Sequence, residues 1–193
     1  MNINNTVQVV TIIVMAVFYI AYFAKQMSQR RLGIDTMILG KGDKPESQKR
    51  LETMLKVATF AMPVVELLSI WWNLMTIPMW LQWIGVVIAE LGVLFFIAGM
   101  LTMKGNWRAG VPEKKETSLV TTGIYGISRN PAFVGFDLMY LGIVVAFPNA
   151  WHAVAAAYTA WLLHKQIKGE EEFLEKAFGK EYYEYKNKVR RYL

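Results

Sequence analysis

Lysine and arginine are absent from three long stretches of this chain, residues 1–24, 57–103 and 130–164. These stretches hold most of the Leu, Ile, Val, Phe and Trp, and the 21 basic residues lie between and after them. Charged side chains are costly inside a lipid bilayer, so long stretches without them are typical of membrane-spanning segments. Only 19% of the 193 residues are charged, whereas soluble domains average about 25%. The sequence therefore predicts a polytopic membrane protein.

The three stretches divide into about five helical segments. A bilayer core of about 30 Å needs roughly 20 helical residues, which residues 6–24 supply as a first span. The second stretch is too long for one span and is broken by a proline-containing turn, so it predicts helices over residues 54–75 and 79–103. The third is broken at Pro148 and predicts a tilted or partly re-entrant hairpin over residues 132–164, with arms of about 16 residues. The predicted fold class is all-α, a polytopic membrane helix bundle.

The basic residues also predict the orientation of these segments. The first five residues, the turn at Pro78 and the turn at Pro148 carry no Lys or Arg, and every other segment end does. Basic residues stay on the cytosolic side of a membrane. We therefore expect a multi-pass protein of a prokaryotic cell membrane, with its N-terminus outside and its C-terminus in the cytosol. Chemistry on soluble molecules then belongs to the cytosolic face.

Composition excludes several kinds of site. The chain has no Cys and only two His residues, so disulfides are excluded and no metal centre is predicted. The net charge of +6 does not indicate nucleic-acid binding, because the basic residues flank apolar spans and membrane topology explains them.

The cytosolic segments differ in what their sequences predict. Residues 25–53 contain three glycines and one proline among mixed charges, which indicates a flexible connector without chemistry. In the tail, apolar residues recur at helical spacing from Leu174 to Val189 and predict an amphipathic helix, interrupted near Gly179. The acidic run from Glu170 to Glu172 lies at the start of this tail and is compatible with a solvated helix start.

The loop of residues 104–131 combines glycines, aromatic residues and arginine directly before Pro131. Proline suits the first turn of a helix, and the exposed N–H groups of that turn, beside Arg129 and Asn130, could hold an anionic or polar group. The composition is equally compatible with an ordinary interfacial belt of Trp and Tyr. Composition alone leaves both interpretations open.

Three motifs follow one another around the predicted hairpin. They read Leu119-Val120-Thr-Thr-Gly123-Ile-Tyr125, then Arg129-Asn130-Pro131-Ala132-Phe133-Val-Gly135, and after the hairpin Glu170-Glu171-Glu172-Phe-Leu174 with Phe178-Gly179-Lys-Glu-Tyr182-Tyr-Glu-Tyr185. In order and spacing this region, roughly residues 105–191, resembles the isoprenylcysteine carboxyl methyltransferase and phospholipid methyltransferase family of integral membrane enzymes. The resemblance implies transfer of a methyl group from S-adenosylmethionine to a lipid-like or prenylated acceptor.

The resemblance also implies which residues form the site. Arg129, Gln166 and Glu171 would be the catalytic residues, with Glu171 as the base if the acceptor were an amine. A carboxylate acceptor would need no base, because its nucleophile is already ionised. Carried over position by position, the cofactor pocket would comprise Thr117, Ser118, Leu119, Val120, Tyr125, Asn130, Pro131, Ala132, Phe133 and Glu170.

Three positions depart from the family pattern. Asn130 stands where the family has His, Phe133 where it has Tyr, and Gln166 where prenylcysteine enzymes have an Arg expected to hold the substrate carboxylate. A neutral Gln cannot supply that charge-assisted fork. The sequence therefore favours the superfamily reaction over the prenylcysteine substrate.

We expect two regions, N-terminal membrane helices over residues 1–103 and a methyltransferase-like catalytic region over residues 104–193. The expected partners are the lipid bilayer and an amphiphilic or lipidated acceptor. Two other functions stay open. One is an NADPH-dependent membrane lipid reductase of the sterol-reductase type, whose cofactor diphosphate would need a denser basic pocket. The other is a non-catalytic membrane scaffold or small transporter, which Glu66, Glu90 and Asp137 within the apolar spans permit.

Overall fold

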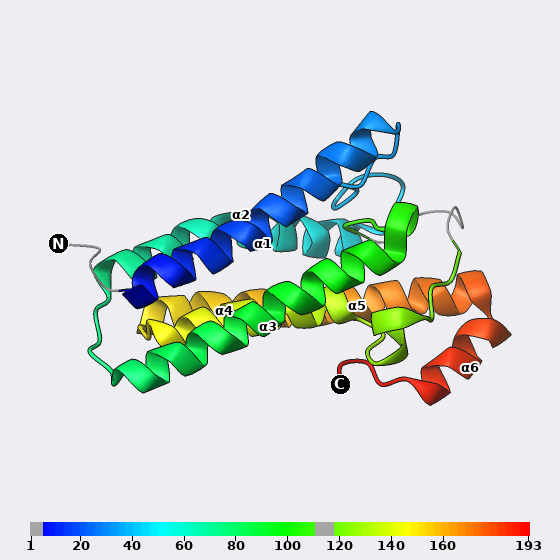
Figure 1. Cartoon of the computed structure of the whole chain (residues 1–193). Coiled ribbons are helices and arrows are strands. Elements are labelled where there is room, and N and C mark those ends of the chain that lie inside the picture. Colours follow the sequence, from blue (N-terminus) through cyan, green and yellow to red (C-terminus); the bar gives the residue numbers. More distant parts are fainter. Residues whose placement is uncertain (1–5, 111–117) are drawn as a thin grey trace.

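The computed structural model describes residues 6–110 and 118–193, and within these residues the chain is helical without a β-strand. Figure 1 shows the helices packed lengthwise into one bundle. In chain order the elements are α1 (Thr6–Arg31), α2 (Glu46–Trp72), α3 (Met79–Met103), the 3₁₀ helices η1 (Lys104–Asn106) and η2 (Gly123–Gly126), α4 (Pro131–Ala146), α5 (Ala150–Phe178) and α6 (Lys180–Lys188).

The two ends of the bundle carry different segments. The start of α1, the α2–α3 turn and the α4–α5 turn gather at one end, on the left of Figure 1. The connector of residues 32–45, η1, η2 and α6 gather at the other end. The two turns without basic residues and the start of α1 thus lie at one end of the bundle, as their predicted common side requires; the first five residues lie outside the described residues.

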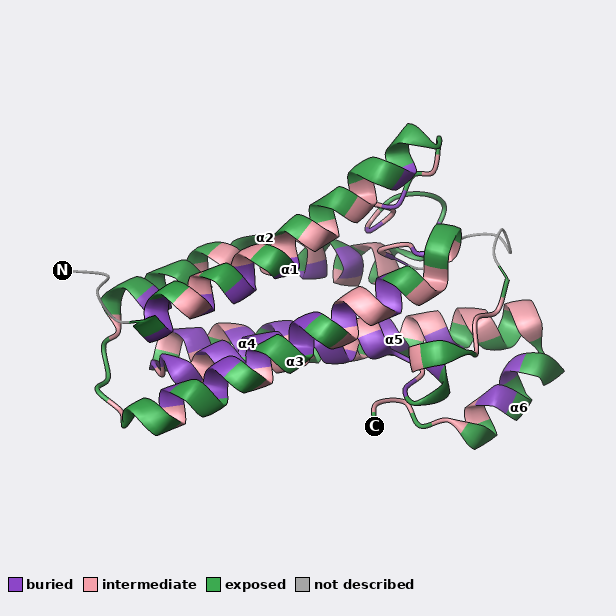
Figure 2. Ribbon diagram, viewed as in Figure 1, coloured by how far each residue is buried: buried purple, intermediate pink, exposed green. Residues whose placement is uncertain are grey.

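The long helices suit a membrane. α1, α2 and α3 are each long and apolar enough to cross a bilayer, and α4 is apolar but has only 16 residues. Figure 2 shows exposed positions along their outer faces, and these include large apolar side chains such as Ile20, Trp80 and Leu94, which are 62–66% exposed. Outward-facing apolar side chains are expected where the solvent is lipid. The predicted all-α, polytopic membrane fold is confirmed.

Helix ends differ from the prediction where a helix continues past the apolar stretch. The third span was predicted at residues 79–103, and α3 has those bounds. By contrast, α1 continues to Arg31 and α2 begins at Glu46, because the flanking Lys, Arg, Gln and Glu residues are good helix formers. Flanking charged residues therefore indicate where an apolar stretch ends, but they do not indicate where the helix ends.

The second arm of the hairpin and the first part of the tail form one helix, α5. The acidic run Glu170 to Glu172 therefore lies well inside a helix, and its interpretation as a helix start was wrong. The predicted interruption near Gly179 is confirmed, since that residue has a φ of +50° and separates α5 from α6. A positive φ is readily adopted only by glycine.

Helices α3 and α4 pack with almost no space between their backbones. An added Cβ would lie 2.5 Å from backbone atoms of α4 at Gly85 and 2.6 Å at Gly92. The same is true in the other direction, with 2.7 Å at Gly135 and 2.4 Å at Gly142. Small residues allow this close approach, which is the usual way in which membrane helices gain packing energy.

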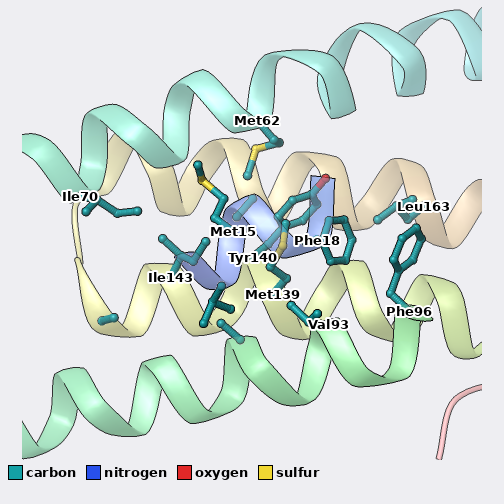
Figure 3. Close-up of a cluster of buried hydrophobic side chains, with 14 of the residues drawn as sticks. Met15, Phe18, Met62, Ile70, Val93, Phe96, Met139, Tyr140, Ile143 and Leu163 are labelled. Carbon is teal, nitrogen blue, oxygen red and sulfur yellow. The ribbon is translucent and has the colours of Figure 1, made fainter. Parts of the chain in front are cut away.

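Aromatic side chains fill the middle of the bundle beside this contact. Phe18 of α1 stacks on Phe96 of α3 with ring centroids 4.3 Å apart and meets Phe136 of α4 edge to face at 4.9 Å. Figure 3 shows Phe18, Phe96 and Tyr140 pointing into the space between the helices. This core joins α1 to the α3–α4 pair and closes one side of the site described next.

Candidate active site

A cavity lies where the connector of residues 32–45, the loop after α3 and the middle of α5 meet the membrane helices. Its membrane side is aromatic, with Tyr19, Tyr22 and Phe23 from α1 and Phe60 from α2. Its other side carries the polar groups. The remaining lining residues are Leu39, Leu55, Thr59, Pro63, Phe96, Met103, Asn106, Trp107, Arg108, Ala109, Gly110, Tyr125, Arg129, Asn130, Ala132, Phe133, Phe136, Leu163, Gln166, Glu170, Phe173 and Leu174.

The structure brings together most, but not all, of the site residues predicted from the sequence. Those in the cavity wall are Tyr125, Arg129, Asn130, Ala132, Phe133, Gln166 and Glu170. Those outside the wall are Ser118, Leu119, Val120, Pro131 and Glu171; Ser118 is exposed and accepts a hydrogen bond from Asn106. Thr117 lies outside the described residues. The hairpin thus returns Glu170 to the Tyr125–Phe133 segment, as the sequence predicted.

Glu170 is the acidic group of the cavity wall. Gln166 donates a hydrogen bond to one of its carboxylate oxygens at 3.1 Å. Burial raises the pKa of Glu170 to about 8, and the neighbouring charge of Glu52 raises it as well, whereas Gln166 and Lys44 act in the opposite direction. A cation placed beside this carboxyl group would favour its ionised form and offset the effect of burial.

The loop before α4 is held in place by the end of the chain. The Tyr185 hydroxyl donates to the backbone oxygen of Tyr125 at 2.7 Å, and the Asn130 amide donates to the backbone oxygen of Arg191 at 3.1 Å. Arg129 is held in the same way: its backbone N–H donates to the oxygen of Arg190 and its guanidinium donates to the oxygen of Val189. The tail after α6 thus fixes the wall of the cavity.

Glu171 is buried at the centre of an ion-pair triad, in which Arg129 is also buried and Arg191 is partly exposed. Arg129 binds one carboxylate oxygen at 2.8 Å and Arg191 binds the other at 2.6 Å. Burial by itself would raise the pKa of Glu171, but the hydrogen bonds from Arg191 and Arg129 outweigh burial and lower that pKa. A carboxylate held by two arginines is a poor proton acceptor, so this geometry does not support the expected role of Glu171 as a base.

Gln166 does not face the cavity as a free amide. Its side chain is 1% exposed. Its oxygen accepts from Gln48 at 3.1 Å, and its nitrogen donates to Glu170 and, at 3.5 Å, to Glu52. The expectation of a catalytic role for this residue is not supported by its position, which is that of a bridge between two acidic side chains.

Several residues that pack beside the site were missed by the sequence analysis. Residues 25–53 were interpreted as a flexible connector, and this was wrong, because α1 continues to Arg31, α2 begins at Glu46 and the residues between them are held by hydrogen bonds. Lys44 and Glu52 form a buried ion pair there, and Ile38 and Thr36 pair through their backbones with Ala109. The available signal was weak: one Lys and one Glu eight residues apart in a strongly charged segment.

Comparison with known proteins agrees with these observations. Residues 80–181 match the phospholipid methyltransferase family. A human protein-S-isoprenylcysteine O-methyltransferase is 34% identical over 124 residues, which cover 63% of this chain and 44% of that protein. The yeast protein of the same name (Saccharomyces cerevisiae) is 33% identical over 109 residues, which cover 55% of this chain and 46% of that protein. The matched part therefore spans about half the length of these curated relatives.

The fold has a solved counterpart. The structure of a eukaryotic intramembrane Ras methyltransferase, an isoprenylcysteine carboxyl methyltransferase, superposes with a TM-score of 0.62 at 23% sequence identity. The likeness covers 91% of this chain and 62% of that chain, and at this identity it bears on the fold alone. Since the match to the family extends over more than half of the sequence, from α3 to α6, this chain belongs to the phospholipid methyltransferase family.

Proposed function

We propose that this protein is a membrane methyltransferase that transfers a methyl group from S-adenosylmethionine to a lipid-like or prenylated acceptor at the cytosolic membrane interface. The observation that carries the proposal is the composition of one cavity. Its aromatic wall comes from membrane helices α1 and α2, and its polar wall comes from the family motifs around Tyr125, Asn130 and Glu170. Such a cavity can accept an amphiphile from one side and a polar cofactor from the other.

The residues present fit the proposed cofactor. When bound, S-adenosylmethionine supplies an activated methyl group on a sulfonium and carries a cationic amino group and an aromatic base. Glu170 offers a carboxyl group to the amino group, and Tyr125, Phe133 and Phe173 offer apolar faces to the rest of the molecule. The chain contributes binding, alignment and exclusion of water, which are the main requirements of methyl transfer.

Among the described residues the site offers no evident general base, and this limits which acceptors it can serve. Because Glu171 is held by Arg129 and Arg191, an acceptor whose nucleophile is already ionised suits this site better than an amine. Arg108 lies in the cavity wall, anchored by hydrogen bonds from its guanidinium to the backbone oxygens of Gly105 and Trp107. That cation can attract an anionic acceptor group, which Gln166 cannot do.

A nicotinamide cofactor fits the cavity less well. A diphosphate needs several cationic side chains or a helix N-terminus with free N–H groups. In the described part of the chain the cavity wall holds the guanidinium groups of Arg108 and Arg129, and Arg129 is already paired with Glu171. The reductase alternative is therefore disfavoured by the charges of the site.

The acidic run provides a direct test of the cofactor assignment. We expect Glu170→Ala to weaken binding of S-adenosylhomocysteine by about 1.5–3 kcal/mol, the usual scale for a hydrogen bond to a charged group. Glu172→Ala is the matched control, because Glu172 is exposed and lies outside the cavity wall. Calorimetric titration of both purified variants in detergent measures the difference. Equal affinities in the two variants would remove Glu170 from the cofactor site.

The proposed orientation is testable because the natural chain has no cysteine. A single cysteine at Leu74, in the turn between α2 and α3, should react with a membrane-impermeant thiol reagent added to intact cells. One at Lys41, in the connector at the opposite end, should react only after the cells are opened. Both positions are exposed, so accessibility within the protein does not decide the result. The reverse labelling pattern would place the candidate site outside the cell and contradict the proposal.

A further inference from the structure

A buried ion pair lies next to the polar wall of the cavity. The Lys44 ammonium and the Glu52 carboxylate are 2.7 Å apart, with side chains 6% and 0% exposed. Lys44 also donates to the backbone oxygen of Ile38 at 2.9 Å, and the backbone N–H of Gly40 donates to Glu52 at 2.7 Å. The pair is therefore built into the fold of the connector, where desolvated charges require such partners.

Two amide side chains link this ion pair to the cavity. Gln48 donates to Glu52 at 3.0 Å and to the Gln166 oxygen at 3.1 Å. The Gln166 nitrogen in turn donates to Glu170 at 3.1 Å and lies 3.5 Å from Glu52. Two carboxyl groups, one inside the ion pair and one in the cavity wall, thus share a single amide group.

We propose that Lys44 and Glu52 are positioning residues that act on Glu170 through Gln166 and Gln48, and that their opposite charges set how readily Glu170 ionises when the cofactor's cationic end arrives. This inference rests on the proposed function. It also accounts for Gln166: an amide can donate to both carboxyl groups while it accepts from Gln48, whereas an arginine cannot accept a hydrogen bond. In this proposal the ion pair, and not a charge at position 166, sets how readily Glu170 ionises.

The direction of each effect follows from charge. A nearby negative group disfavours ionisation of a carboxyl group and a nearby positive group favours it. Burial is the largest cause that raises the pKa of Glu170; Glu52 raises this pKa further and Lys44 lowers it, with a net value of about 8. The titratable and charged groups that face Glu170 or share its cavity are Glu52 of α2, Lys44 of the connector, Tyr125 of η2, Tyr19 and Tyr22 of α1, and Arg108 and Arg129.

The test is the pH dependence of S-adenosylhomocysteine binding to the purified 193-residue chain in detergent, measured by calorimetry from about pH 6 to about pH 9. In the unmodified protein, affinity should rise with pH and level off near the pKa of Glu170, about 8. Glu52→Gln should move the midpoint of this rise to lower pH, and Lys44→Gln should move it to higher pH. At pH 7 each change should alter affinity by about threefold to tenfold, in opposite directions, because a shift of one pKa unit is a factor of ten.

Four further variants make the result decisive. Lys44→Arg keeps the charge and should restore the original midpoint, and Glu170→Gln should abolish the pH dependence. Lys41→Gln and Asp35→Asn, which break an exposed ion pair in the same connector, should change nothing. If Lys44→Gln fails to fold, the two single variants Glu52→Gln and Glu170→Gln still test the direction in which the midpoint moves.

The outcomes separate the inference from the proposed function. Loss of affinity at every pH in both ion-pair variants, with an unmoved midpoint, would reduce the ion pair to a structural role and overturn the inference. Binding by the unmodified protein without any pH dependence would also overturn the inference while leaving the methyltransferase proposal intact. No binding of S-adenosylhomocysteine by the unmodified protein at any pH would instead contradict the proposed function itself.

Discussion

Replacing Gly142 by alanine is expected to destabilise the protein by about 3 kcal/mol or more, the upper range for overpacking a well-packed interface. The added Cβ would lie 2.4 Å from the backbone nitrogen of Ala89 and 2.5 Å from the backbone oxygen of Gly85. Backbone atoms inside a helix cannot move aside as a flexible side chain can, so α3 and α4 would have to separate along their contact. Thermal unfolding in detergent should show a fall of about 6–12 °C in the melting temperature.

Gly99→Ala is the matched control for this prediction. Gly99 lies on the same face of α3, but an added Cβ would lie 3.2 Å from the nearest atom, the backbone nitrogen of Ala132. A shift of a few tenths of an ångström would accommodate it, and alanine favours the helix over glycine by about 1 kcal/mol. The melting temperature should therefore stay nearly constant or rise. A similar fall in both variants would mean that steric contact is not what the glycines provide.

The glycine spacing that underlies this contact is visible in the sequence, although the α3–α4 contact was not predicted from it. Gly85, Gly92 and Gly99 recur every seven residues in one predicted span, and Gly135 and Gly142 recur at the same interval in the next. A seven-residue interval returns to nearly the same helix face, so the two series could have predicted that α3 and α4 pack together. What the sequence could not give is the register in which the two series interlock, because that depends on the turns and on the third helix beside them.

The membrane helices were predictable because the bilayer imposes one strong rule. The absence of Lys and Arg defined the apolar segments, and the bounds of α3 followed directly. The same rule failed outside the bilayer, where α1, α2 and α5 continue as helices through charged sequence. There the helix is stabilised by propensity and by tertiary contacts, for which a hydropathy pattern contains no information.

For the site, too, part could be predicted from the sequence and part could not. Motif order predicted that Glu170 would meet Tyr125 and Asn130, and the cavity contains all three. The roles of Gln166 and Glu171 could not be predicted, because each is decided by partners far away in the chain: Gln48 for the first and Arg191 for the second. The sequence pattern identified the positions, but only the fold shows which hydrogen bonds are already occupied.

The ion-pair triad of Glu171, Arg129 and Arg191 is expected to contribute strongly to stability. Glu171→Gln should destabilise the protein by about 3 kcal/mol, the lower end of the range for breaking a buried ion pair, since Arg129 is nearly buried but Arg191 is 33% exposed and partly solvated. The variant leaves two arginines facing a neutral amide, which can accept hydrogen bonds with only one of its two terminal atoms. It should also loosen the tail that holds the loop before α4, and so weaken binding of S-adenosylhomocysteine.

Glu172→Gln is the control, because it removes the same charge from the next position of α5, where the side chain is exposed. A pH series gives an independent check. The pKa of Glu171 is lowered from its ordinary value of 4.5, so the stabilising contribution is fully present above that value and is lost as the pH falls through the lower one. The gap in melting temperature between the unmodified protein and Glu171→Gln should therefore narrow in acid. A gap that is absent at neutral pH, or that stays constant down to about pH 3, would show that the two arginines are satisfied without the Glu171 charge.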